Sequence, residues 1–208
     1  MSACEKRGRW VEAQDFLVAM RLRCLESDTI VWNRLISALE KSELWRGALG
    51  MVGKMRQRGT PTGTSTLNSV ISACEKGHHW EGASLLVGEL WRDWLEPDVI
   101  TCNAAISACE KGQQWQSALG LLEDMPRRGI VPNIITYNAA ISACEQGRQW
   151  QSALRLVDEM QGQDILLDTI TYNAALRACE KGQQRQSALG LLEEMQGRVI
   201  MENVIIGS

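Results

Sequence analysis

The sequence predicts an all-α protein built as an α-solenoid, a stack of antiparallel helical hairpins. Three observations lead to this prediction. The chain repeats itself with a period of 35 residues and no insertion or deletion, the apolar residues within each period have helical spacing, and strand signals are absent. A fixed period between about 20 and 50 residues is typical of stacked arrays, in which each repeat buries its apolar face only against its neighbours.

Columns of identical residues establish the period. The segment from Asn103 to Met125 returns almost unchanged from Asn138 to Met160 and again from Asn173 onward. A tryptophan column and a glutamate column extend the same spacing across the chain, and the sixth tryptophan position holds Arg185. Their members are Trp10, Trp45, Trp80, Trp115 and Trp150, and Glu5, Glu40, Glu75, Glu110, Glu145 and Glu180.

Residues 99–133 illustrate one repeat. A first helix is expected from Ile100 to Lys111, because this segment holds good helix formers and small side chains, and Gly112 is expected to end it. A second helix is expected from about Gln114, since its apolar residues form one buried stripe. The stripe consists of Trp115, Ala118, Leu119, Leu122 and Met125. The glycine and proline of residues 127–133 then end the hairpin.

This frame divides the chain into five complete repeats and two partial ones. The complete repeats are residues 29–63, 64–98, 99–133, 134–168 and 169–203. Residues 1–28 are expected to be the second helix of a truncated repeat, and residues 204–208 start a further one. Because natural arrays end in polar caps, the sequence is expected to be a piece of a longer chain.

The cysteines occupy a packing column of the same period. Its members are Cys4, Cys74, Cys109, Cys144 and Cys179. Leu39 fills the one vacant position, and a position that accepts leucine suits an apolar side chain. Reduced, buried thiols are therefore expected here in place of disulfides or a metal site.

Composition and motifs argue against several kinds of function. The net charge is −3, so any nucleic-acid binding must depend on local placement of charge. No apolar run is long enough to span a membrane, and no signal or transit segment is recognisable. The sequence also lacks a glycine-rich phosphate loop, an HExxH motif and a CxxC motif. No catalytic residue, metal, cofactor or small-molecule substrate is predicted, and the chain is not expected to be an enzyme.

The 35-residue hairpin resembles the pentatricopeptide repeat family over essentially the whole chain. The resemblance rests on TYNAAI at the start of the first helix, ALGLLEDM in the second and GIVPN at the junction. The period of 35 residues separates it from the related tetratricopeptide repeats. The resemblance implies a right-handed superhelix that binds single-stranded RNA, mostly in mitochondria and chloroplasts, with about one base read per repeat. A cytoplasmic location is expected only if the chain is complete.

An asparagine column near the start of the first helix is the first candidate site. Its members are Asn33, Asn68, Asn103, Asn138 and Asn173. A side-chain amide offers donors and acceptors to the edge of an unstacked base, and the resemblance assigns base contact to this column. The alternative is helix capping. It is less favoured because threonines two residues earlier are available as caps. They are Thr66, Thr101, Thr136 and Thr171.

The last residue of each repeat forms the second candidate column. Its members are Gly63, Asp98, Asn133, Asp168 and Asn203. The resemblance implies that this residue and the asparagine of its own repeat jointly select the base. An ionised Asp only accepts, so it suits the N3–H of uracil, whereas Asn suits cytosine or, less strictly, uracil. The implied target is 5′-U-Y-U-Y-3′, with the choice at Gly63 left open. Turn chemistry is the alternative explanation for this column.

Two further columns complete the predicted RNA site. The resemblance assigns base stacking to isoleucines three residues before the asparagine, with ordinary core packing as the alternative. They are Ile30, Ile100, Ile135 and Ile170, and Ser65 interrupts the column. A lysine column at the end of the first helix is predicted to contact phosphates. Its members are Lys41, Lys76, Lys111 and Lys181. A favourable helix dipole explains any single lysine equally well.

These columns predict a sequence-selective, non-enzymatic binder of single-stranded RNA that acts in organellar mRNA processing, stability or translation. Other RNA-processing proteins are expected as additional partners, and no membrane is expected. The alternative is a protein-binding scaffold of the tetratricopeptide type, whose acidic composition would hold a basic partner. The near identity of the last three repeats is also consistent with recent duplication without a selected target.

Overall fold

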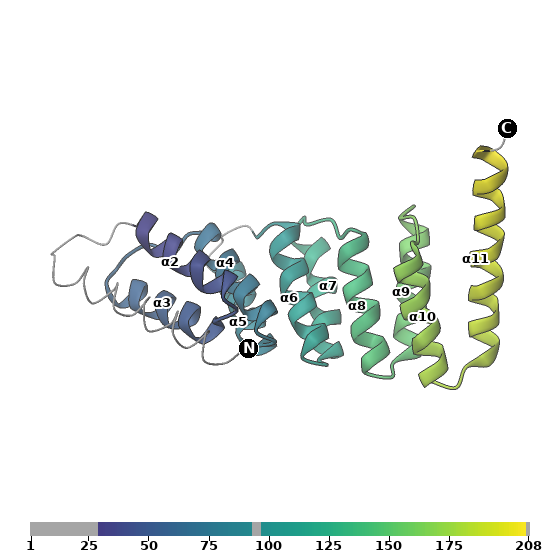
Figure 1. The fold of residues 1–208 in the computed structure, drawn as a ribbon, viewed down its shortest axis with the longest axis horizontal. Helices are drawn as coiled ribbons and strands as arrows, with labels where there is room; N and C mark the ends of the chain where they lie inside the picture. The colour runs from purple at the N-terminus through teal and green to yellow at the C-terminus, as the bar shows by residue number, and fades with distance from the viewer. Residues whose placement is uncertain (1–28, 93–96, 207–208) are drawn as a thin grey trace. The chain divides into compact units, whose positions relative to one another are not determined.

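The computed structural model describes residues 29–92 and 97–206, with side chains described as far as residue 196. All regular secondary structure in these residues is α-helical, which confirms the predicted fold class (Figure 1). The first helices of the repeats are α2 (Thr29–Lys41), α4 (Thr64–Lys76), α6 (Val99–Lys111), α8 (Ile134–Gln146) and α10 (Thr169–Lys181). The second helices are α3 (Trp45–Gln57), α5 (Trp80–Arg92), α7 (Trp115–Arg127), α9 (Trp150–Gly162) and α11 (Arg185–Ile206).

The helices belong to two compact bodies, residues 1–112 and residues 113–208. In the first body, α2, α4 and α6 pack side by side in that order, and α3 and α5 pack against them as a second layer. In the second body, α8 packs on α10, while α7, α9 and α11 cover them in the same way. Each body is thus a short stack of hairpins in which first helices contact first helices of the neighbouring repeats.

Small side chains allow the first helices to approach one another closely. In α8, for example, Ala140, Ala143 and Cys144 are fully buried. Cys74, Cys109, Cys144 and Cys179 are buried free thiols, as expected of a packing column, whereas Cys4 lies outside the described residues. Burial raises the pKa of Cys74 to about 12 and that of Cys144 to about 11, so these thiols are unreactive at neutral pH.

Gly112 is the C-cap of α6, as predicted, and the glycine after four of the first helices has a second role. Gly112 has a φ of −83°, and the left-handed residue is the next one, Gln113, at 57°. A Cβ on Gly112 would overlap the indole of Trp80 from the preceding repeat. The same overlap recurs between Gly77 and Trp45, Gly147 and Trp115, and Gly182 and Trp150. The glycine and tryptophan columns therefore form one contact between successive repeats.

The end of α11 differs from the other second helices. In the three earlier repeats whose junction is described, the second residue after the end of the second helix has a positive φ: Gly59, Gly129 or Asp164. The same position in the last repeat is Val199, a β-branched residue that avoids positive φ. The helix accordingly continues to Ile206, so it does not end at the predicted repeat boundary between residues 203 and 204. Residues 1–28, predicted to be a partial repeat, lie outside the described residues.

No helix in the described part of the chain is long and apolar enough to cross a membrane.

Candidate nucleic-acid interface

The last residue of a repeat is the N-cap of the following first helix. The side-chain oxygens of Asp98, Asn133 and Asp168 accept hydrogen bonds from the backbone N–H three residues later, at 2.8, 3.1 and 2.8 Å. Gly63 occupies the same position in extended backbone and offers no side chain. The turn chemistry considered for this column is thus present, as helix capping. Capping places these side chains at the amino-terminal edge of α6, α8 and α10.

The prediction that the threonines are the caps was wrong. They occupy the third position of α4, α6, α8 and α10, and their side chains are fully or almost fully buried: Thr66, Thr101, Thr136 and Thr171. Asn133 with Thr136 and Asp168 with Thr171 instead form capping boxes, in which the threonine hydroxyl accepts from the backbone of the cap residue. The signal was the Asp or Asn three residues before Thr101, Thr136 and Thr171.

The asparagine column lies inside the first helices, at their fifth position, so it does not cap them. In the repeat from residue 134 to 168, the two predicted base-reading residues are in contact. Asn138 Nδ2 donates to Asp168 Oδ1 at 3.2 Å and lies 3.3 Å from Oδ2. Thr171 of the next repeat donates to Asn138 Oδ1 at 2.6 Å, and Thr66 donates to Asn33 Oδ1 at the same distance.

The other members of the two columns are placed less uniformly. The Asn68 Oδ1 atom is buried and has no hydrogen-bond partner among the described residues. Asn103 is half-buried in the first body, Asn133 is half-buried in the second, and Asn173 is exposed. Asn203 lies in the backbone of α11, and its side chain is outside the described residues.

The isoleucine column is exposed, which decides against ordinary core packing. The exposed fractions of Ile30, Ile100, Ile135 and Ile170 are 58, 72, 61 and 65%. Each is the second residue of its first helix, close to the N-cap. Sequence reasoning missed Val131 and Leu166, which are 77 and 78% exposed two residues before the N-caps Asn133 and Asp168. An aliphatic residue inside a polar junction is the signal that would have found them.

The lysine column is paired with the glutamate column of the preceding repeat. Lys76 contacts Glu40 at 2.8 Å, Lys111 contacts Glu75 at 2.9 Å, and Lys181 contacts Glu145 at 2.9 Å. The glutamate 36 residues before Lys41 in the sequence is Glu5, which lies outside the described residues. The partly exposed ammonium groups thus already hold a carboxylate, which a phosphate would have to share or displace.

Hydrogen bonds also set the charge state of the acidic caps. The Thr101 hydroxyl is the main cause that lowers the pKa of Asp98 below its ordinary value. For Asp168, burial alone raises the pKa, but the hydrogen bonds from Thr171, Asn138 and nearby backbone together outweigh burial and lower it. Both caps are therefore anionic acceptors at neutral pH.

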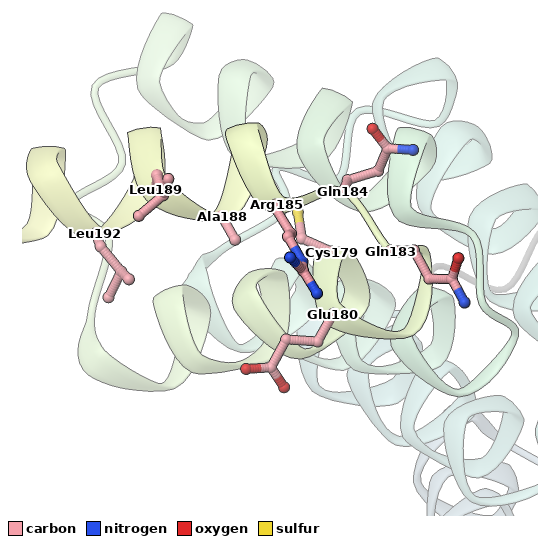
Figure 2. A pocket seen from close by; sticks show the side chains of 8 residues that line it. All are labelled: Cys179, Glu180, Gln183, Gln184, Arg185, Ala188, Leu189 and Leu192. Carbon is pink, nitrogen blue, oxygen red and sulfur yellow. The ribbon is translucent and has the colours of Figure 1, made fainter.

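An open groove of about 750 Å³ lies between the end of α10 and the start of α11 (Figure 2). Figure 2 shows Arg185, Ala188, Leu189 and Leu192 along α11 beside this groove. Leu192 is 40% exposed, whereas Leu122 and Val157, its counterparts in earlier repeats, are buried. This part of α11 is therefore exposed where the earlier second helices are covered, and we assign no ligand to the groove. In the described residues, no group of His, Cys, Asp and Glu is arranged to hold a metal ion.

Sequence profiles identify the family. The profile of the PPR repeat family matches residues 97–146 and 132–181, and the PPR repeat profile matches residues 30–60 and 170–200. Together they cover more than half of the chain, so the chain belongs to the pentatricopeptide repeat family. A search of curated proteins with the sequence found no match.

Solved structures share the fold. The pentatricopeptide repeat protein PPR10 from maize is 23% identical, with a TM-score of 0.68 over 92% of this chain and 28% of its own. The PPR domain of Arabidopsis thaliana protein-only RNase P 1, solved with tRNA, is 15% identical, with a TM-score of 0.68 over 80% of this chain and 88% of its own. Nuclear proteinaceous RNase P 2 from A. thaliana is 10% identical, with a TM-score of 0.71 over 79% and 37%. The chain spans about a quarter of the length of the maize protein.

Proposed function

We propose that this chain binds single-stranded RNA in a sequence-selective way, along the amino-terminal edge of its first helices. The observation that carries the proposal is the contact between Asn138 and Asp168 near the exposed Ile135 and Ile170. Membership of the pentatricopeptide repeat family supports it, and one protein with the same fold was solved with tRNA. No catalytic role is proposed for any described residue.

The chemistry of each pair favours a pyrimidine. Uracil presents an N3–H donor flanked by two carbonyl acceptors, so Asp168 would accept from N3–H while the Asn138 amide donates to a carbonyl. Asn68 with Asp98 would read uracil in the same way. The family resemblance alone assigns cytosine or uracil to the other two repeats, through Asn103 with Asn133 and Asn173 with Asn203. The proposed target is therefore 5′-U-Y-U-Y-3′, with one base for each repeat from residue 64 to 203.

The isoleucines would hold the bases in place between successive repeats. An exposed aliphatic side chain loses water when a base covers it. Aromatic platforms elsewhere contribute about 1–3 kcal/mol per base, and an aliphatic side chain without a π-face should contribute at the lower end of this range. Ser65 interrupts the column, so the base next to it should be held more weakly. The lysine column would add phosphate contacts where it competes successfully with its glutamate partners.

We further propose that the protein acts by occupying a transcript in a mitochondrion or chloroplast, and so takes part in mRNA processing, stability or translation. A single-stranded segment covered by the repeats is protected from nucleases and kept free of secondary structure. The support for this step is family resemblance, and localisation of the tagged full-length protein together with RNA recovered by crosslinking tests it.

Binding of labelled short RNA strands, followed by fluorescence anisotropy, tests the proposed function. The chain should prefer a strand rich in UC and UU steps over a purine strand. The double variant Asn103→Ala, Asn138→Ala should lose this preference. Gln151→Ala, an exposed amide on the second helix α9, is the matched control and should retain it. Equal binding to both strands, or none, would remove base reading as the function.

A protein-binding scaffold is the second candidate, because the ion pairs between the lysine and glutamate columns leave less free positive charge than the sequence suggested. Under this alternative, the variant with both asparagines replaced by alanine would bind the protein partner as tightly as the wild type does.

A further inference from the structure

The four buried threonines are unexpected features of the first helices. Among the described residues, the buried polar side chains are Thr66, Thr101, Thr136 and Thr171, each with an exposed fraction of 2% or less. A buried hydroxyl without a hydrogen bond costs free energy, so its presence in successive repeats indicates that it serves a bonded role. Capping explains this role only in part, because Thr66 follows Gly63, which has no side chain.

The shared partner of two of these threonines is the asparagine of the preceding repeat. Thr66 Oγ1 donates to Asn33 Oδ1 at 2.6 Å across 33 residues of sequence. Thr171 Oγ1 donates to Asn138 Oδ1 at 2.6 Å across the same separation. The second helix of the hairpin lies between the two residues in sequence, so each bond exists only when consecutive first helices are stacked.

The neighbouring acid defines which way the Asn138 amide points. Because an ionised carboxylate only accepts hydrogen bonds, the Asn138 atom beside Asp168 must be Nδ2. Oδ1 then faces the Thr171 hydroxyl, which satisfies it. One N–H of Asn138 is held by Asp168, and the second N–H is left to donate to a base. A rotated amide would place its NH₂ against the threonine and its oxygen against the carboxylate.

The hydroxyl of Thr171 has one proton for two acceptors, since Asp168 Oδ1 lies 2.8 Å away and Asn138 Oδ1 lies 2.6 Å away. The repeat from residue 64 to 98 shows the other outcome. Thr101 donates to Asp98 at 2.6 Å, and Asn68 Oδ1 is buried with no partner in the described residues. The Thr101 hydroxyl thus bonds the cap residue and leaves Asn68 Oδ1 unpaired, whereas the Thr171 hydroxyl lies within hydrogen-bond distance of both the cap residue and the asparagine.

We propose that Thr66 and Thr171, the buried third residues of α4 and α10, position the base-reading asparagine of the preceding repeat, so that the base-recognition sites of Asn33 and Asn138 each span two consecutive repeats. This inference rests on the proposed RNA binding. It assigns the threonines a specificity role: they set the direction in which the amide presents its donor. A repeat would then read its base selectively only when a hydroxyl follows it in the next repeat. Asn173, for which the sequence places Ile206 in the threonine register, should be the least selective.

Thr171→Val tests the proposal, because valine keeps the shape of threonine and removes the hydroxyl. In the wild-type chain, the preference for U over C at the base read by Asn138 is measured with strands that differ at that base. Thr171→Val should lower this preference about three- to tenfold, the effect of one lost hydrogen bond, and Thr171→Ser should retain it. Thr169→Val, an exposed position in the same helix, is the control and should change nothing. An unchanged preference in Thr171→Val would overturn the proposal.

A second measurement does not depend on RNA. The side-chain amide signals of Asn138 in ¹H–¹⁵N spectra of the free protein should move toward those of exposed asparagines in Thr171→Val and stay in place in Thr171→Ser. Thr66→Val should shift the amide signals of Asn33 in the same way, and it disturbs no side-chain cap because Gly63 has no side chain. This variant keeps the test possible if Thr171→Val does not fold. If the wild type binds no RNA, the proposed function fails, and these spectra alone test whether the threonine positions the asparagine. Unchanged amide signals in the valine variants would overturn the positioning role.

Discussion

Asn138 and Asp168 are separated by 30 residues in sequence, yet the amide nitrogen of the first lies 3.2 Å from the carboxylate of the second. The contact exists because Asp168 caps α10 while Asn138 lies one turn inside α8, and the two first helices pack side by side. The pair predicted to read one base is therefore assembled before any RNA is present. Such preorganisation reduces the ordering cost of binding.

Shortening an exposed isoleucine should weaken RNA binding without weakening the fold. Ile135→Ala removes a side chain that is 61% exposed, so the free energy of unfolding should change by less than about 0.5 kcal/mol. The lost stacking should raise Kd about fivefold, equivalent to about 1 kcal/mol. Leu85→Ala on α5, where the leucine is 60% exposed, is the matched control. Equal effects of the two variants in anisotropy titrations would contradict a stacking role for Ile135.

Glycine to alanine substitutions should have opposite effects at two positions of the second body. Gly147→Ala places a Cβ against the Trp115 indole and should lower the free energy of unfolding by about 1–3 kcal/mol. Gly120→Ala adds a Cβ in the middle of α7, with no atom within 4 Å, and should raise it by about 0.5–1 kcal/mol. Urea denaturation followed by circular dichroism measures both changes. A stable Gly147→Ala variant would show that the indole contact is dispensable.

Acid should destabilise the chain through its acidic caps. The pKa of Asp98 and of Asp168 is lowered from 3.8 in the folded state, so the unfolded chain binds protons more readily as the pH falls. Their contribution is fully present above the unfolded pKa and is lost as the pH falls below 3.8 through the folded pKa. Asp168→Asn keeps a capping side chain, as Asn133 shows for α8, and should lose less stability in acid.

Unfolding free energies measured between about pH 5 and pH 2 check this prediction, with Asp158→Asn on the exposed face of α9 as the control. Identical acid profiles for Asp168→Asn and the wild type would show that the cap carboxylate does not contribute.

Removing a glutamate should strengthen RNA binding. Glu75 holds Lys111 at 2.9 Å, so Glu75→Gln should free the ammonium group for phosphate and lower Kd. The plot of log affinity against log salt should become steeper by about 0.7 for each additional phosphate of a single strand that the protein neutralises. Lys111→Gln should have the opposite effect on the slope. If neither variant changes the salt dependence, the lysine column serves only to pair with glutamate.

Much of the fold was predictable because one pattern appears repeatedly. The 35-residue period, the buried stripe of each second helix and the small residues of the first helices together determine a stack of hairpins. The site columns were also visible in the sequence, since Asn138 and Asp168 each recur, as the same or a similar residue, at the same position of other repeats. Within a single repeat, neither would have stood out.

What the sequence did not reveal depends on offsets between neighbouring repeats. The partner of Lys76 is Glu40, 36 residues earlier, and only the stacking of α4 on α2 brings them together. The second role of Gly112 was missed for the same reason, because only stacking brings Trp80 of the preceding repeat to the position that a Cβ would occupy. Capping was assigned to the threonines, but the last residue of the repeat is the cap. The sequence did not distinguish them, since Thr, Asp and Asn are all good caps. The continuation of α11 was also not predicted, although Val199 stands where other repeats have Gly59, Gly129 or Asp164.

Exchange of one cap residue tests the central claim most directly. Asp168→Asn changes a carboxylate that only accepts into an amide that also donates, and it retains a capping side chain. Competition between strands that carry U or C at the base read by Asn138 measures the effect. We expect the preference to move from U toward C at that base alone, with the preference at the base read by Asn68 and Asp98 unchanged. An unaltered preference at the first base, or an equal change at both, would contradict base reading by the paired columns.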